Sequence, residues 1–210
     1  MTGAEGVTKY RLQHEASALP PNLRTERLSH WFRRCRERAL IGRDPDRYDG
    51  YAYGNISQRH SPGFIISGTQ TGGEPALRPE LLAWVLDFDI DNNWLHACGP
   101  ARPSSEAMTH GQVYRARPDV GGVIHVHSPL LWHAAASLGI ATTPADVAYG
   151  TPDMARAVEK LLRTNAGGTA GLFCMGGHED GLFAYGRDLD AAGDRLFSAL
   201  DKATRTGIHD

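Results

Sequence analysis

The chain has 210 residues, of which 41% are hydrophobic and 22% charged, a composition typical of one globular domain with a sizeable core. The formal net charge of −2 argues against a nucleic-acid-binding protein, and no apolar run in the sequence is long enough for a transmembrane helix. Three widely spaced cysteines and an N-terminus without the apolar core of a signal peptide predict a reduced, cytoplasmic protein.

The N-terminal part of the sequence divides into two segments. Residues 1–23 are expected to be a lead segment or a strap across a neighbouring subunit, and residues 24–210 to be the folded domain. Residues 24–41 carry Leu28, Trp31 and Phe32 at helical spacing, with charged residues on the opposite face. This pattern predicts an amphipathic helix that covers a sheet and ends at Gly42.

Two short strands are predicted around residues 51–56 and 64–66, joined by a Ser-Pro-Gly turn. Glycine, serine and threonine cluster beside them, in Gly54-Asn55-Ile56-Ser57 and in Ser67-Gly68-Thr69. Glycine lets the backbone approach an anion, and N–H groups and hydroxyls can donate hydrogen bonds to it. Such clusters are more often plain turns, so on their own they are weak evidence for an anion site.

The motif Pro103-Ser104-Ser105-Glu106 follows two further predicted strands, at 85–88 and 94–98. A helix is expected over residues 104–117, which places Glu106 and His110 on one face, four residues apart. The simple interpretation of the motif is a helix N-terminus with an acidic residue in its first turn.

His125 and His127 end a β-rich run and, being two residues apart on a strand, point to the same face. An isolated His-x-His is usually structural, but two such rings can converge on one cation. Glu106 lies nineteen residues before His125 (125 minus 106), across one helix and one turn, so it can fold back beside the same ion. A carboxylate beside a histidine-bound metal suits proton abstraction from carbon.

The C-terminal part is predicted to contain a helical apolar run after His127, a helix over about 152–162, strands at 170–175 and 181–186, and a helix over 189–204. The first of these strands delivers Gly176-Gly177-His178. If three histidines bind a metal, His178 is the third almost by elimination.

These motifs together resemble the class II (zinc-dependent) aldolase/adducin head family, which includes fuculose-phosphate aldolase, the closest in motif, and ribulose-phosphate epimerase. The resemblance extends over roughly residues 24–200 and includes the serine-glutamate motif, His110, Tyr114, Arg117-Pro118-Asp119 and the His-x-His strand. It implies one three-layer α/β/α domain with a mixed, largely antiparallel central sheet. It also implies a phosphorylated small-molecule substrate and a homotetramer with sites near subunit interfaces.

The resemblance also implies roles for single residues. The metal would be held by His125, His127 and His178, and Zn²⁺ is expected ahead of Mn²⁺, Co²⁺ or Fe²⁺. Glu106 would be the base, because the family's aldolases carry glutamate there and its epimerases aspartate. Phosphate would be held by a polar set consisting of Asn55, Ser67, Gly68, Thr69, Ser104 and Ser105. Tyr149 and Tyr185 are candidates for the acid, and His110 is either a fourth ligand or a supporting residue.

The hypothesis is a lyase that cleaves or forms a carbon–carbon bond in a phosphorylated keto-sugar through a metal-stabilised enediolate. Alternatives on the same site are a keto-acid phosphate decarboxylase and a sugar-phosphate dehydratase; an epimerase, an Fe(II) oxygenase and a non-catalytic adducin-like scaffold rank lower. Two departures from the family leave the substrate open. Glu179 replaces the glycine that usually follows the third histidine, and the segment between His127 and Tyr149 looks shortened relative to fuculose-phosphate aldolase.

Overall fold

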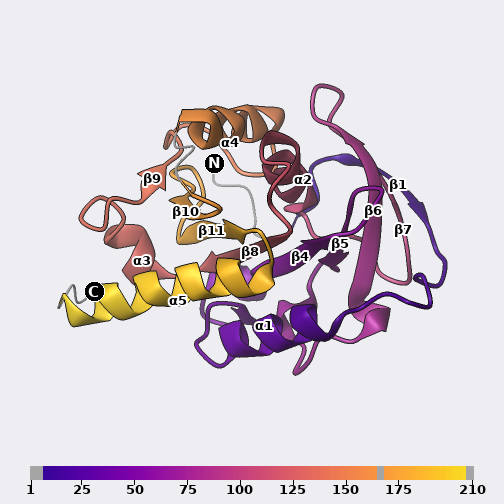
Figure 1. Ribbon diagram of the computed structural model, residues 1–210, viewed down its shortest axis with the longest axis horizontal. Helices are drawn as coiled ribbons and strands as arrows, with labels where there is room; N and C mark the ends of the chain where they lie inside the picture. Colours follow the sequence, from indigo (N-terminus) through magenta and orange to yellow (C-terminus); the bar gives the residue numbers. More distant parts are fainter. Residues whose placement is uncertain (1–6, 165–167, 207–210) are drawn as a thin grey trace.

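The computed structural model describes residues 7–164 and 168–206, and its central feature is a mixed sheet with helices on both faces (Figure 1). Within these residues the sheet has nine strands in the order β1-β7-β6-β5-β4-β8-β11-β10-β9. The outermost pairs, β1/β7 and β10/β9, are parallel, and the other neighbours are antiparallel. The predicted three-layer α/β/α fold with a largely antiparallel sheet is confirmed.

The strands of this sheet are β1 (Arg11–Glu15), β4 (Asn55–Arg59), β5 (Phe64–Ser67), β6 (Leu82–Asp89), β7 (Trp94–Cys98), β8 (Gly122–His127), β9 (Ala141–Thr142), β10 (Ala170–Cys174) and β11 (Gly181–Gly186). A separate hairpin pairs β2 (Gly42–Arg43) with β3 (Ala52–Tyr53). The α-helices are α1 (Glu26–Arg36), α2 (Ala107–Ala116), α3 (Pro129–His133), α4 (Pro152–Thr164) and α5 (Leu189–Arg205). Figure 1 shows α2 and α4 on one face of the sheet and α1 and α5 on the other.

Strand β8 shows how the sequence separates the two faces. Val123 packs in the core with α2 and α4, whereas Ile124 and Val126 pack in the core with α1 and α5. Because side chains alternate along a strand, His125 and His127 share the face of Val123. A slip of one residue would move both imidazoles into the apolar core on the other face, so the hydrophobic pattern fixes their direction.

The first helix is shorter than predicted. Helix α1 ends at Arg36, and Ala39 rather than Gly42 takes the left-handed conformation, with φ 52°. The N–H of Leu40 donates to the carbonyl of Cys35 at 3.0 Å, which closes the helix end. Leu40 and Ile41 are then buried, so packing of these two side chains accounts for the early stop.

The predicted lead segment includes part of the sheet. Strand β1 runs parallel to β7 at one edge, and the Tyr10 hydroxyl, just before it, donates to the carbonyl of Ser104 at 2.8 Å. The described part of residues 1–23 is therefore packed against the domain.

Two other helices differ in length from the prediction. Helix α2 begins at Ala107, so Ser104 and Ser105 lie in the turn before it. The apolar run after His127 forms only the short helix α3, and the residues up to Gly139 form turns. In the described part of the chain, no helix has both the length and the apolar character needed to span a membrane.

Candidate active site

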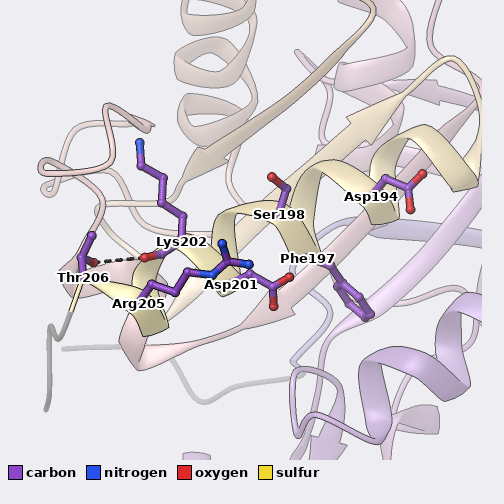
Figure 2. A pocket seen from close by; sticks show the side chains of 7 residues that line it. All are labelled: Asp194, Phe197, Ser198, Asp201, Lys202, Arg205 and Thr206. Carbon is purple, nitrogen blue, oxygen red and sulfur yellow. Dashed lines mark hydrogen bonds between the residues drawn. The ribbon is translucent and has the colours of Figure 1, made fainter.

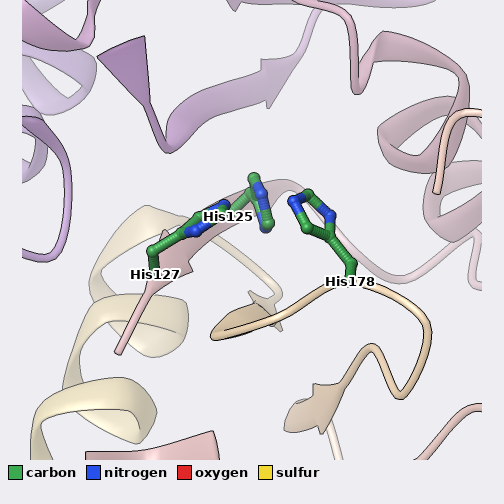
Figure 3. Close-up of side chains that lie close together, drawn as sticks. All are labelled: His125, His127 and His178. Carbon is green, nitrogen blue, oxygen red and sulfur yellow. The ribbon is translucent and has the colours of Figure 1, made fainter. Parts of the chain in front are cut away.

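Three histidines from two segments form the centre of the candidate site (Figure 3). His125 and His127 come from β8, and His178 comes from the turn between β10 and β11. The turn faces the end of β8 because β11 pairs with β8 and places Gly181 opposite His127. Each ring offers a nitrogen, and these nitrogens lie within 4.8 Å of one another, so the cluster could hold a metal ion. The structure thus brings together the three predicted ligands.

The hydrogen bonding of His125 fits a metal ligand. Its Nδ1 lies 3.0 Å from the carbonyl oxygen of Leu182, which can only accept, so Nδ1 carries the proton. The lone pair is therefore on Nε2, which is buried and has no hydrogen-bond partner among the described residues. Metal-binding histidines commonly donate their second N–H to a carbonyl in this way.

Burial keeps the cluster in the form that metals bind. It is the main cause that holds the pKa of His125 and of His127 well below the usual value, and charge on His178 would lower both further. Both rings are therefore neutral at neutral pH, with lone pairs available for a cation.

Glu106 lies at the N-terminal end of α2 with its carboxylate beside this cluster. Its Oε1 is 3.8 Å from Nδ1 of His178, and its Oε2 accepts a hydrogen bond from the Thr109 hydroxyl at 3.0 Å. The side chain is buried, and the helix dipole favours a negative charge at this end. The predicted base is thus placed next to the predicted metal ligands.

His110 also lies on α2, but its contacts differ from those of the cluster. Its Nε2 is 2.6 Å from Oδ1 of Asn55, and its Nδ1 is 2.7 Å from Oγ of Ser57. Burial lowers the pKa of His110 to about 3, so the ring is neutral. Because both nitrogens are engaged, the supporting role fits His110 and that of a fourth ligand does not.

The segments predicted to hold phosphate meet at the same end of the sheet. Asn55, at the start of β4, is the direct neighbour of His125 across the strands. The carbonyl of Ser67, at the end of β5, accepts from the N–H of Ser104 at 3.2 Å. Asn55, Ser67, Ser104 and Ser105 are all buried.

The backbone of the Ser67-Gly68-Thr69 segment is used in a way that the sequence did not predict. The N–H of Gly68 donates to Leu81, and the N–H of Thr69 donates to Arg102. A Cβ on Gly68 would lie 2.8 Å from that of Ala101, so the glycine is needed for close packing between protein segments. The N–H groups of Gly68 and Thr69 are therefore not available to an anion, whereas hydroxyl and amide side chains of this region can act as donors.

The turn that carries His178 depends on glycine. A Cβ on Gly176 would lie 2.3 Å from the carbonyl oxygen of Thr143, and one on Gly177 would lie 1.9 Å from that of Val147. Only glycine permits this approach, and it sets His178 against Tyr149, with ring centroids 4.3 Å apart and stacked.

Tyr149 is contacted in turn from the N-terminal segment. Nζ of Lys9 donates to the carbonyl oxygen of Tyr149 at 2.9 Å and lies 3.7 Å from the centroid of its ring. No lysine lies close in sequence to the segments predicted to hold phosphate. The contact between Lys9 and Tyr149 arises only because these two residues meet in the fold.

A second cluster beside His127 was not predicted. The Tyr48 hydroxyl donates to the Asp180 carboxylate at 2.6 Å, Arg47 lies 3.3 Å from the same carboxylate, and the Tyr48 ring packs edge-on against His127 at 4.6 Å. Tyr48 and Asp180 have φ values of 53° and 61°, conformations that few residues other than glycine adopt. Glu179, the residue that departs from the family pattern, is exposed.

Tyr185 lies away from the site. It is two residues beyond Phe183 on β11 and faces Val123, and its ring packs near Arg117 and Phe173. Phe183 stacks on His125 and so occupies the intervening position. Of the two predicted acid candidates, the structure places only Tyr149 against the histidines.

A hollow on the molecular surface lies along the C-terminal part of α5 (Figure 2). It is lined by side chains of that helix and of the residue directly after it: Asp194, Phe197, Ser198, Asp201, Lys202, Arg205 and Thr206. Thr206 there donates to the carbonyl of Lys202 at 3.2 Å. A groove along one helix lacks the groups from several elements that converge at the histidine cluster, so the latter remains the candidate active site.

The site combines a mixed sheet, three buried imidazoles that could hold a metal ion, a buried carboxylate and a serine turn, and these features together define a class of α/β domain. Residues 44–206 match the family described as Class II Aldolase and Adducin N-terminal domain. This match covers more than half of the chain, and the chain belongs to that family.

Curated relatives give narrower similarities. A 77-residue segment is 39% identical to the 5-methylthioribulose-1-phosphate/5-deoxyribulose-1-phosphate aldolase of Rhodospirillum rubrum, covering 36% of this chain and 31% of that protein. A 95-residue segment is 52% identical to the methylthioribulose-1-phosphate dehydratase of Xanthomonas campestris pv. campestris, covering 45% of this chain and 39% of that protein. In both cases the match spans well under half the length of the relative.

Solved structures support the fold. The l-fuculose-1-phosphate aldolase of Thermus thermophilus superposes with a TM-score of 0.58 at 21% identity, over 86% of this chain and 92% of that one. Another L-fuculose 1-phosphate aldolase gives a TM-score of 0.63 at 17% identity, over 90% and 86% of the two chains.

Proposed function

We propose that the chain is a metal-dependent lyase acting on a 1-phosphorylated 2-ketose of the methylthioribulose 1-phosphate type. The observation that carries this proposal is the Glu106 carboxylate set beside three buried imidazoles, because it pairs a base with a cation site. The substrate class comes from the names of four relatives, each of which includes methylthioribulose 1-phosphate.

The ion would be held by His125, His127 and His178. Neutral imidazoles suit Zn²⁺ first, with Mn²⁺, Co²⁺ or Fe²⁺ as alternatives. When bound, such an ion supplies Lewis-acid stabilisation of negative charge on substrate oxygens. Three protein ligands leave part of the coordination sphere for substrate, as expected of a catalytic site.

The polar residues around the cluster have separate tasks in this proposal. Glu106 takes the proton from the carbon next to the ketone, and Thr109 holds its carboxylate in position. The side chains of Asn55, Ser67, Ser104 and Ser105 hold the phosphate, with Thr69 at the partly exposed end of the same segment. Tyr149 donates the proton to the leaving oxygen, since its ring lies against His178.

Two reactions can follow proton transfer at such a site. In dehydration, the proton leaves C3, the C4–O bond breaks, and the products are a 2,3-diketone and water. In aldol cleavage, the proton leaves the C4 hydroxyl and the C3–C4 bond breaks, which releases an aldehyde. C3 of the remaining fragment then takes up a proton, and the second product is dihydroxyacetone phosphate. We place dehydration first because the relative that aligns with 82% of this chain, from Xanthomonas oryzae pv. oryzae, is named as a dehydratase at 27% identity. The name of the Rhodospirillum rubrum relative supports cleavage as the second candidate.

Incubation of the metal-loaded protein with methylthioribulose 1-phosphate separates these outcomes. Mass spectrometry and proton NMR should show a phosphorylated product lighter by one water, with no aldehyde. An aldehyde together with dihydroxyacetone phosphate would establish cleavage. Recovery of unchanged substrate with Zn²⁺, Mn²⁺, Co²⁺ and Fe²⁺ in turn would refute the proposal and favour a scaffold role.

The proposal also includes a homotetramer in the cytoplasm with active sites near subunit interfaces. Sedimentation velocity at several concentrations measures the assembly directly. A monomer that retains full turnover would remove the interface from the mechanism.

A further inference from the structure

A chain of four hydrogen-bonded side chains runs behind the histidine cluster, from α2 to the start of β4. The Tyr114 hydroxyl is 2.8 Å from Oγ of Ser57, which is 2.7 Å from Nδ1 of His110. The opposite nitrogen of His110, Nε2, is 2.6 Å from Oδ1 of Asn55. All four side chains are buried, so water competes little for these contacts.

The direction of proton donation follows from the two ends of the chain. Tyr114 donates to Ser57, Ser57 donates to Nδ1 of His110, and the Nε2–H of His110 donates to Oδ1 of Asn55. In the opposite direction the Tyr114 proton would have no acceptor, because Ser57 is the one hydrogen-bond partner of that hydroxyl within residues 7–164 and 168–206. A buried donor without an acceptor costs about 1–3 kcal/mol, which selects the first direction.

The direction of proton donation determines which group of the Asn55 amide faces the candidate active site. Its carbonyl oxygen is held by His110, so its NH₂ group is the part of the amide left to face a ligand. Asn55 is the neighbour of His125 in the sheet and projects from the same face, which places this NH₂ group beside the metal cluster. The amide in the reverse orientation would present an oxygen and repel an anion.

The Asn55 NH₂ group matters because two adjacent backbone donors are already engaged. The N–H groups of Gly68 and Thr69, in the neighbouring segment, both donate to other parts of the protein. An anion beside this segment therefore cannot use these two N–H groups, which increases the importance of side-chain donors such as the Asn55 amide.

We infer that His110 is a positioning residue which, with Ser57 and Tyr114, fixes the Asn55 amide so that its NH₂ group faces the phosphate of the substrate. The inference rests on the proposed function, in which Asn55 contacts that phosphate. His110 itself touches neither metal nor substrate.

The test uses Tyr114→Phe, which removes one hydroxyl and leaves the ring. Binding of inorganic phosphate to the metal-loaded protein, measured by isothermal titration calorimetry, should weaken about threefold to tenfold, the range for one hydrogen bond. Ser57→Ala, which breaks the contact to His110 directly, should weaken it at least as much. With methylthioribulose 1-phosphate, KM should rise more than kcat falls.

A double-mutant cycle separates positioning from general destabilisation. In the Asn55→Ala background, Tyr114→Phe should have no further effect on phosphate affinity, and metal content should stay at the wild-type level in every variant. Tyr185→Phe is the matched control, because it removes a tyrosine hydroxyl outside the four-residue chain and should leave phosphate affinity unchanged.

Three outcomes would overturn the inference. If Asn55→Ala weakens phosphate binding but Tyr114→Phe and Ser57→Ala do not, the phosphate site stands and the positioning role fails. If Asn55→Ala itself has no effect, its proposed contact with phosphate fails and the inference fails with it. Loss of metal in His110→Asn would make His110 a ligand. Phosphate binding needs no turnover, so these results are independent of which reaction is catalysed.

Discussion

The two halves of the histidine cluster are held by different kinds of structure. His125 and His127 lie on β8, which is hydrogen-bonded to β4 on one side and to β11 on the other. His178 lies on a turn, where it is positioned by stacking on Tyr149 and followed by Asp180 with φ 61°. Backbone ladders on both sides hold the strand half. The turn half has the hydrogen bonds of the turn itself, from the N–H of His178 to Met175 and from the N–H of Gly181 to His178, together with side-chain contacts. Local opening is easier where fewer backbone bonds must break. Substitutions in the strand half should therefore cost stability as well as metal, and substitutions in the turn half mainly metal.

The largest effect on catalysis is expected where the two halves meet, at Glu106. Glu106→Gln keeps an oxygen that can accept the Thr109 hydrogen bond but removes the base. Turnover should fall by about 10²–10⁴, the usual contribution of a general base, while metal content and unfolding midpoint stay close to wild type. Steady-state kinetics and elemental analysis of the same sample check this. Turnover within tenfold of wild type would assign the base to another group.

Alanine variants of the histidines test the comparison directly. His178→Ala and His125→Ala should both lose bound metal after dialysis. His125→Ala should also lose about 2 kcal/mol or more of unfolding free energy without metal, because it leaves a cavity against the stacked ring of Phe183. Denaturant unfolding of the metal-free proteins measures this difference. Equal destabilisation by the two variants would mean that the turn is as firmly held as the strand.

The same difference explains which parts of the site the sequence could predict. The direction of the two histidine side chains on β8 could be predicted, because side chains alternate between the two faces of a strand. The apolar residues Ile124 and Val126 face the core, so His125 and His127 lie on the opposite face. Strand β11 was also predicted, whereas β1, which lies in the expected lead segment, and the two-residue strand β9 were not.

The turn half depends on contacts between segments distant in sequence, which no local pattern encodes. Tyr48 meets Asp180 across 132 positions, and Lys9 meets Tyr149 across 140. The only local signal for the first pair is a short polar turn, and left-handed φ values at non-glycine residues are not visible in sequence. The family resemblance supplied the roles of single residues, and the structure supplied their neighbours.

Acid should destabilise the metal-free protein through the buried imidazoles of β8 and of the adjacent helix α2. The pKa of His110 is lowered to about 3 and those of His125 and His127 are also lowered, so the unfolded chain binds more protons than the folded one below the ordinary pKa of 6.5. The stabilisation is complete above about pH 6.5 and is lost as pH falls, by up to about 1.4 kcal/mol per pH unit for each ring. Denaturant unfolding of the metal-free protein between pH 7.5 and 4.5 measures the slope. His110→Asn removes one of these rings and should show a shallower slope; an identical slope would mean that His110 does not contribute.

The smallest effects are expected for Tyr149 and Tyr185, the two candidates for the acid. Replacing each by phenylalanine removes one hydroxyl and so compares a tyrosine next to the turn half with one on the sheet. Tyr149 stacks on His178 in the turn half, whereas Tyr185 lies on β11 near Arg117, beyond Phe183. Tyr149→Phe retains the stacked ring and should reduce kcat by about tenfold or more if its hydroxyl protonates the leaving oxygen, with metal content unchanged. Tyr185→Phe should change kcat by less than about twofold, because its hydroxyl contacts no residue of the site. An equal loss of kcat in both variants would indicate altered packing of the sheet, because Phe183 connects the two regions. The acid would then have to be sought in the Arg47–Tyr48–Asp180 cluster.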